Sequence, residues 1–157
     1  MILILIASSF LGIFKSLALK RRAEELRGII YAVEHIKTGI SFDRKSVPSL
    51  LSELEKERCR LFYAVGKEAV GKTVAEAYEK VKKENVSFLS ESDIKTVDLF
   101  FSALGRSGAD GQTSLCDGTL SRLSKQLSEA DEKYKKYGGV FSKSGILAGL
   151  FIVILLL

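Results

Sequence analysis

Tryptophan is absent from this chain of 157 residues, and proline and histidine each occur once. Because proline is the residue that interrupts helices most strongly, a single Pro48 permits long helices over nearly the whole chain. Apart from the short apolar run 61–65, no segment shows the period-two alternation of a β-strand. The sequence therefore predicts an all-α protein with the length of one ordinary domain.

Cysteine is also scarce, with Cys59 and Cys116 far apart and without C-x-x-C spacing. We interpret them as small buried residues of a reducing compartment, although the spacing leaves a disulfide open. The lone His35 has no nucleophile with which to form a catalytic set, which favours a structural role. The carboxylates fall on exposed helix faces, so the sequence predicts no catalytic, cofactor-binding or metal site.

The stretch "VGKEAVGKTV", residues 65–74, matches the P-loop pattern G-x-x-x-x-G-K-[ST]. A P-loop needs a doubly wound sheet, and the rest of the chain lacks the strands to build one. Thr73 and Glu76 instead have the spacing of a capping box at a helix start. We interpret Gly71 as the preceding turn and the whole motif as helix punctuation.

Long apolar runs occupy both ends of the chain, where residues 1–19 contain only the charge of Lys15 and residues 138–157 only that of Lys143. At about 1.5 Å per helical residue, each run is long enough for a bilayer core of roughly 30 Å. Both are predicted to be transmembrane helices that flank a domain at 20–137. In the first run the positive charges follow the apolar stretch, which indicates a retained anchor and not a signal peptide.

Basic residues indicate the orientation of these two segments. In both segments the basic residues cluster at the end nearest the central domain. By the positive-inside rule the central domain is therefore predicted to be cytoplasmic, with both termini across the membrane. These basic clusters also account for the net charge of +5. The charge therefore does not indicate a nucleic-acid-binding surface, and we predict no nucleic-acid partner. The flanking residues are Lys15, Lys20, Arg21, Arg22 and Arg27 for the first segment and Lys133, Lys135, Lys136 and Lys143 for the second.

Apolar spacing and capping residues predict the helices of the central domain. The first continues from the N-terminal segment, and the last, of more than forty residues, leads into the C-terminal one. The fold is predicted to be an antiparallel helical bundle of about six helices whose first and last helices extend into transmembrane helices. The second to fifth helices are predicted to start at Ser46 with Pro48, near Cys59, at Thr73, and at Ser90 with Asp93. The second helix is predicted to run through residue 58. The predicted buried stripe of the first helix is Leu26, Ile29, Ile30, Val33, Ile36 and Ile40.

The glycine-rich loop "GRSGADGQ", residues 105–112, precedes the last helix. A phosphate site there is disfavoured by Asp110, which we interpret as a helix cap, with Gly105 or Gly108 ending the helix before it. The last helix starts roughly 42 Å from the bilayer, which puts the loop at the membrane-distal tip. Arg106 and Gln112 are expected to be exposed there and, with Asp110, to contact a partner protein; Arg106 would do so electrostatically.

Several segments resemble the stage III sporulation protein AB family of endospore-forming bacteria. They are "ALGRSGADGQ", "EADEKYKKYGGVFSKSGILAGLFIVILLL", "KRRAEELRGIIYAVEHIKTGISF", "VPSLL" and "TVAEAYEKV". The resemblance implies a mother-cell membrane protein of the channel complex between mother cell and forespore. It also implies a helical domain similar to the F-type platform proteins of type II secretion and type IV pilus machines, and a partner ATPase, stage III sporulation protein AA.

The leading expectation is thus a non-enzymatic assembly protein that recruits a cytoplasmic ATPase and uses no cofactor. One alternative is a platform component of a type II secretion or type IV pilus-like system outside sporulation. The other, of a different class, is a small membrane-bound P-loop NTPase that would use Lys72 and Thr73.

Overall fold

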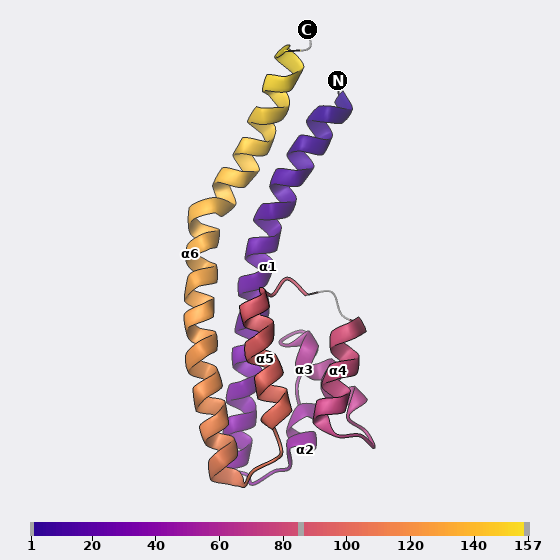
Figure 1. Ribbon diagram of the computed structural model, residues 1–157, viewed down its shortest axis with the longest axis vertical. Helices are drawn as coiled ribbons and strands as arrows, with labels where there is room; N and C mark the ends of the chain where they lie inside the picture. The colour runs from indigo at the N-terminus through magenta and orange to yellow at the C-terminus, as the bar shows by residue number, and fades with distance from the viewer. Residues whose placement is uncertain (1, 85–86, 156–157) are drawn as a thin grey trace. The chain divides into compact units, whose positions relative to one another are not determined.

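The computed structural model describes residues 2–84 and 87–155, and the surroundings of side chains for 13–84 and 87–140 (Figure 1). This part of the chain forms six helices and no strand, which confirms the all-helical prediction. The helices are α1 (Ile2–Ser41), α2 (Val47–Ser52), α3 (Arg60–Glu68), α4 (Val74–Glu84), α5 (Glu91–Ala103) and α6 (Ala109–Leu155).

The chain divides into two compact units. Unit 1 consists of Met1–Glu24 and Leu127–Leu157, and unit 2 of Glu25–Gln126. Helices α1 and α6 therefore contribute residues to both units, whereas α2 to α5 belong to unit 2 alone. The prediction of a last helix longer than forty residues is confirmed, because α6 has 47 residues.

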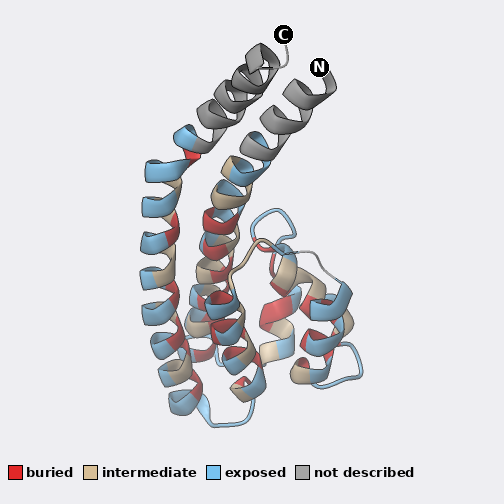
Figure 2. Ribbon diagram, turned by 45° about the horizontal axis from the view of Figure 1, so that its top comes forward, coloured by how far each residue is buried: buried red, intermediate tan, exposed pale blue. Residues whose placement is uncertain are grey.

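Unit 2 is built around one face of α1. Five of its six predicted stripe residues are buried, and Ile30 is half-buried, so the three-and-four spacing identified the inner face correctly (Figure 2). Aromatic rings from three other helices complete the core. The Phe101 ring of α5 lies 4.7 Å from the Phe62 ring of α3 and 4.4 Å from the Tyr78 ring of α4. Buried aromatic pairs of this kind supply a large share of a small core's stability.

Local side-chain hydrogen bonds define the helix starts. Ser46 caps α2 by accepting a hydrogen bond from the Ser49 N–H at 3.4 Å. Ser90 and Asp93 form a reciprocal capping box at α5. These predicted caps are confirmed, and each satisfies backbone N–H groups that a helix start leaves free.

Helix α2 is shorter than predicted, because it ends at Ser52 and not near residue 58. Turns follow it, with the Leu54 N–H bonded to the Leu51 carbonyl at 3.4 Å and the Cys59 N–H to the Glu55 carbonyl at 3.2 Å. Both Leu54 and Cys59 are buried. A continuous helix would hold these residues in one fixed register, whereas the turns allow both apolar side chains to enter the core.

Glycine permits a close approach between α1 and the turn after α2. A Cβ atom at Gly28 would overlap the backbone carbonyl of Arg58. Any other residue at this position would push the turn away from α1, since a backbone carbonyl cannot move as a flexible side chain can.

Helices α1 and α6 run antiparallel within unit 2. Lys37 pairs with Asp117, and Ser41, one turn further along α1, pairs with Thr113, one turn earlier on α6. The predicted antiparallel relationship is confirmed for these two helices.

Unit 1 brings together the N-terminal part of α1 and the C-terminal part of α6. Ser16 and Gly138 lie side by side, since a Cβ atom on Gly138 would be 3.6 Å from the Ser16 hydroxyl oxygen. Large apolar side chains remain on the surface of this unit, each between 40% and 54% exposed. They are Ile13, Phe14, Leu17, Tyr137 and Val140.

Among the residues with described side chains, none of the helices holds a stretch long and apolar enough to cross a bilayer. The predicted transmembrane segments, 1–19 and 138–157, fall largely on residues 1–12 and 141–157, which lie outside that description. The extension of α1 and α6 into membrane helices stays a prediction.

Candidate functional site

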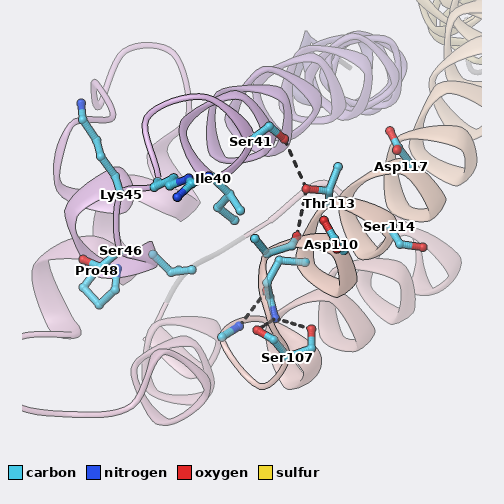
Figure 3. A pocket seen from close by; sticks show the side chains of 15 residues that line it. Ile40, Ser41, Lys45, Ser46, Pro48, Ser107, Asp110, Thr113, Ser114 and Asp117 are labelled. Atoms are coloured by element: carbon cyan, nitrogen blue, oxygen red, sulfur yellow. Dashed lines mark hydrogen bonds between the residues drawn. The ribbon is translucent and has the colours of Figure 1, made fainter.

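An open groove of about 970 Å³ lies at one end of unit 2, where α1 ends and α6 begins (Figure 3). We call it the tip groove. One wall consists of the last residues of α1, residues 44–46 of the connecting segment and the first turn of α2. The other wall is the loop 105–108 with the first turns of α6. The groove thus joins two parts of the chain that are about sixty residues apart.

Gln112 fixes the shape of the second wall. Its side-chain oxygen accepts a hydrogen bond from the Gly105 N–H at 2.9 Å, and its amide nitrogen donates to the Ser107 hydroxyl at 2.8 Å. Only 4% of Gln112 is exposed, so the expectation of an exposed side chain was wrong, and its contact with a partner stays a prediction. The physical reason is that a loop that turns back on a helix leaves backbone groups unpaired, and the Gln112 amide pairs with them.

The loop itself differs from prediction in one further detail. Gly105 has φ +82°, which confirms it as the left-handed residue after α5. Helix α6 begins at Ala109, so Asp110 lies inside the first turn and is not the cap residue. Its exposed carboxylate is close to the free N–H groups of the helix start, where a negative charge is stabilising. Arg106 is exposed as expected, and its contact with a partner stays a prediction.

Two polar pairs connect α1 to α6 beside the groove. The Ser41 and Thr113 hydroxyls are 3.2 Å apart, and the Lys37 ammonium lies 2.6 Å from the Asp117 carboxylate. The hydrogen bond from Lys37 to Asp117, together with the negative charge of Asp117, raises the pKa of Lys37. Since both side chains of the ion pair are well exposed, the pair sets the register of the helices more than it stabilises them.

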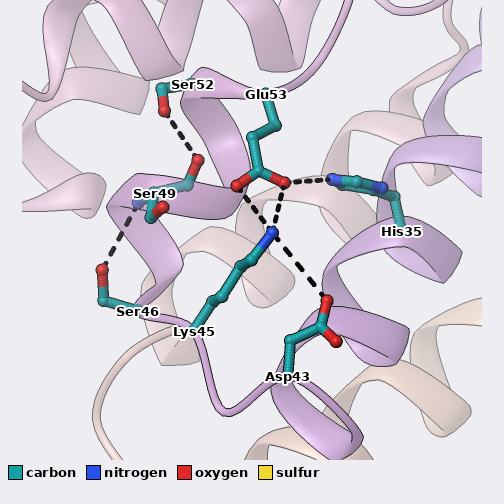
Figure 4. A network of polar contacts seen from close by, with 7 residues as sticks. All are labelled: His35, Asp43, Lys45, Ser46, Ser49, Ser52 and Glu53. Carbon is teal, nitrogen blue, oxygen red and sulfur yellow. Dashed lines mark hydrogen bonds and ion pairs between the residues drawn. The ribbon is translucent and has the colours of Figure 1, made fainter.

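A four-residue network holds the first wall in place (Figure 4). The Lys45 ammonium donates to both Glu53 oxygens, at 3.0 and 3.1 Å, and lies 3.8 Å from Asp43. Its hydrogen bond lowers the pKa of Glu53, and the same bond raises the pKa of Lys45. The His35 Nε2 atom is 3.7 Å from Glu53, which agrees with the structural role predicted for His35.

Two residues of the segment 42–46 are not explained by folding. Phe42 is 82% exposed, although a large aromatic side chain gains most when buried. Arg44 has φ +49°, which makes it the one non-glycine residue with positive φ among the described residues. The sequence pattern predicted this segment only as an interruption between helices. The signal available was one aromatic residue inside the otherwise polar stretch "SFDRKS".

The P-loop-like stretch does not have the geometry of a phosphate-binding loop. Gly66 lies within α3, where a loop would be required, and the Lys72 ammonium donates to Glu68. Lys80 donates to the same carboxylate at 3.0 Å, and the two lysines lower the pKa of Glu68. Thr73 and Glu76 form the predicted capping box, with reciprocal bonds of 3.0 and 3.3 Å.

The two cysteines are free and buried in unit 2. Burial raises the pKa of each thiol to about 11, so both remain protonated and poorly nucleophilic near neutral pH. Within the described part of the chain, no group of histidine, cysteine or acidic side chains has an arrangement that could hold a metal ion.

The comparison with protein families gives one match. The model of the family "stage III sporulation protein AB" matches residues 1–157. The chain belongs to the stage III sporulation protein AB family. Searches of curated proteins and of solved structures each gave no match.

In this member of the stage III sporulation protein AB family, the tip groove offers a shaped surface and not a set of reacting groups. Two of its four ionised side chains are paired, Lys45 with Glu53 and Asp117 with Lys37, and its walls are held by Gln112 on one side and by the Lys45–Glu53 pair on the other. Such an arrangement is suited to binding another macromolecule.

Proposed function

We propose that this chain is a membrane-anchored, non-enzymatic assembly protein of the channel complex between mother cell and forespore. It would recruit a cytoplasmic ATPase, stage III sporulation protein AA, and couple it to the other membrane proteins of the complex. The observation that carries the proposal is the full-length match to a sporulation family. A helical domain similar to F-type platform proteins is part of the same proposal.

The surface of unit 1 supports the membrane anchor. Its exposed apolar side chains lie at 13–17 and 137–140, next to the apolar terminal sequences 1–12 and 141–157. Tyr137 is of the type enriched at the boundary between lipid and water, and lysines surround both stretches in the sequence. In this proposal the termini enter the bilayer of the mother-cell membrane that faces the forespore, and unit 2 is in the cytoplasm.

The tip groove supports a role in binding. Its walls are rigidified by side-chain hydrogen bonds, and exposed residues beside it, Phe42 and Arg106 among them, are available to a partner. In the proposed function, ATP hydrolysis belongs to the partner, and this chain supplies position and contact.

Co-purification tests the proposal. The tagged full-length chain is extracted in detergent together with untagged stage III sporulation protein AA from the same organism. We expect a stoichiometric complex that survives gel filtration. Failure of the two purified proteins to associate, in detergent and in lipid nanodiscs alike, would count against ATPase recruitment.

A further inference from the structure

The segment 42–46 contains two energetically unfavourable features, which lie two residues apart, at Phe42 and Arg44. Phe42 leaves its ring in water, and Arg44 holds a left-handed backbone that is unfavourable for a residue other than glycine. Features of this kind cluster at binding and catalytic sites, where the rest of the fold maintains them. Arg44 lines the tip groove, and Phe42 lies next in sequence to Ser41, which also lines it.

The charges of the groove determine what it can accept. Four ionised side chains line it, and two of them are compensated: Lys45 pairs with Glu53, and Asp117 pairs with Lys37. The Asp110 carboxylate faces the positive end of the α6 dipole. Arg44 has no carboxylate partner among the described residues. The groove thus has two charges without an ion-pair partner among the described residues, the Arg44 guanidinium and the exposed Asp110 carboxylate, and the guanidinium binds carboxylates with two parallel hydrogen bonds.

An apolar surface accompanies this cation. Ile40, Val47 and Pro48 line the same wall, and Phe42 follows directly from α1 with its ring exposed. Aromatic and arginine side chains together are the residue types that contribute most to protein interfaces.

We propose that the tip groove binds a segment of the partner ATPase that carries an apolar side chain next to one or more carboxylates. Phe42 anchors the apolar side chain, and Arg44 pairs with a carboxylate. The proposal rests on the proposed function and adds to it the place and the chemistry of the contact.

Matched variants of the full-length chain in detergent test this contact. Phe42→Ser is compared with Val70→Ser, because both side chains are 82% exposed and only one adjoins the groove. Arg44→Glu is compared with Lys95→Glu, an exposed cation of α5 that does not line the groove. Affinity for purified stage III sporulation protein AA is measured by interferometry at low and high salt, with thermal melts to verify folding.

The expected result is at least a tenfold weaker affinity for Phe42→Ser and for Arg44→Glu, with values near wild type for the two controls. Higher salt should weaken wild type more than Arg44→Glu, because the variant lacks the screened ion pair. In overlapping peptides of the ATPase, a segment with an apolar residue beside carboxylates should bind wild type and not Arg44→Glu.

Three outcomes would overturn the inference. Equal affinities of wild type and all four variants would exclude the groove while leaving ATPase recruitment intact. A change of self-association in Phe42→Ser with unchanged ATPase binding would identify a second copy of the chain as the occupant. An absence of binding by wild type itself would remove the proposed function and this contact together.

Discussion

The side-chain oxygen of Gln112 accepts a hydrogen bond of 2.9 Å from the Gly105 N–H, seven residues earlier in the chain. The amide nitrogen of the same side chain donates to the Ser107 hydroxyl and, at 3.3 Å, to the Ser107 carbonyl. One buried amide thus connects the left-handed glycine after α5 to the first turn of α6. The shape of the tip groove depends on this connection.

Gln112→Ala should destabilise the protein by about 1–3 kcal/mol, because it leaves the Gly105 N–H without its partner and opens a small void. Denaturant unfolding of the detergent-solubilised chain measures the difference. Ser114→Ala, a change at an exposed residue of the same helix turn, is the control and should stay within about 0.5 kcal/mol of wild type. Equal stabilities of the two variants would contradict the role assigned to Gln112.

Thr73→Ala should cost about 1 kcal/mol, since it removes the side-chain oxygen that accepts the Glu76 N–H at the start of α4. Lys72→Ala should change stability by less than about 0.5 kcal/mol, because its ion pair with Glu68 is exposed. Thermal melts separate the two. Magnesium-dependent ATP binding that Lys72→Ala abolishes would restore the P-loop interpretation of this stretch.

Arg44→Gly should leave the protein as stable as wild type or stabilise it by about 0.5 kcal/mol. Glycine adopts φ +49° without the steric cost that arginine bears, and this gain offsets the greater freedom of glycine in the unfolded chain. Asp43→Gly, at a neighbour with ordinary φ, should be destabilising. A marked loss of stability in Arg44→Gly alone would mean that the arginine side chain supports the fold.

Glu53→Gln should lower the melting temperature at pH 7, and the effect should shrink as the pH falls through the lowered pKa of Glu53 in the folded protein. The pKa of Glu53 is lowered in the folded protein by its bond to Lys45, so its contribution is present above the ordinary glutamate pKa. This stabilising contribution is lost as the pH falls through the lowered pKa of Glu53 in the folded state, because Glu53 then becomes protonated and neutral in the wild type as well. Melts from neutral to acidic pH measure the effect, with Glu57→Gln as the control, and equal melting temperatures of wild type and Glu53→Gln at pH 7 would argue against a stabilising ion pair.

A cysteine placed after Leu157 should react with a membrane-impermeant reagent added outside intact cells, whereas cysteines at positions 60 and 90 should not. The basic residues that flank unit 2 in the sequence favour retention of this unit in the cytoplasm. The background is the chain with Cys59 and Cys116 changed to alanine. Labelling at position 60 or 90 from outside would invert the proposed topology.

Sequence patterns predicted those features that depend on neighbours along the chain. Caps at Ser46, Thr73 and Ser90 were correct because the partner of each lies three residues away. The buried stripe of α1 followed from helical period alone. The end of α2 could not be predicted from the helical period, because the burial of Leu54 and Cys59 depends on residues distant in the sequence.

The tip groove shows the same division. Asp110 and Gln112 were recognised as members of one loop, but the burial of Gln112 follows from the path of that loop, which no local pattern specifies. Phe42 and Arg44 were overlooked because exposure and a left-handed φ are properties of the folded chain. Their relation to the loop 105–108 required the packing of α1 against α6.

The two walls of the groove are synthesised far apart in time. Residues 40–48 leave the ribosome early, whereas residues 105–117 follow only after α2 to α5 have been made. A nascent or truncated chain that ends before α6 has half of the surface and lacks the Gln112 connection. An ATPase that docks in the groove would therefore discriminate against chains that end before α6, because such chains lack one wall of the binding surface.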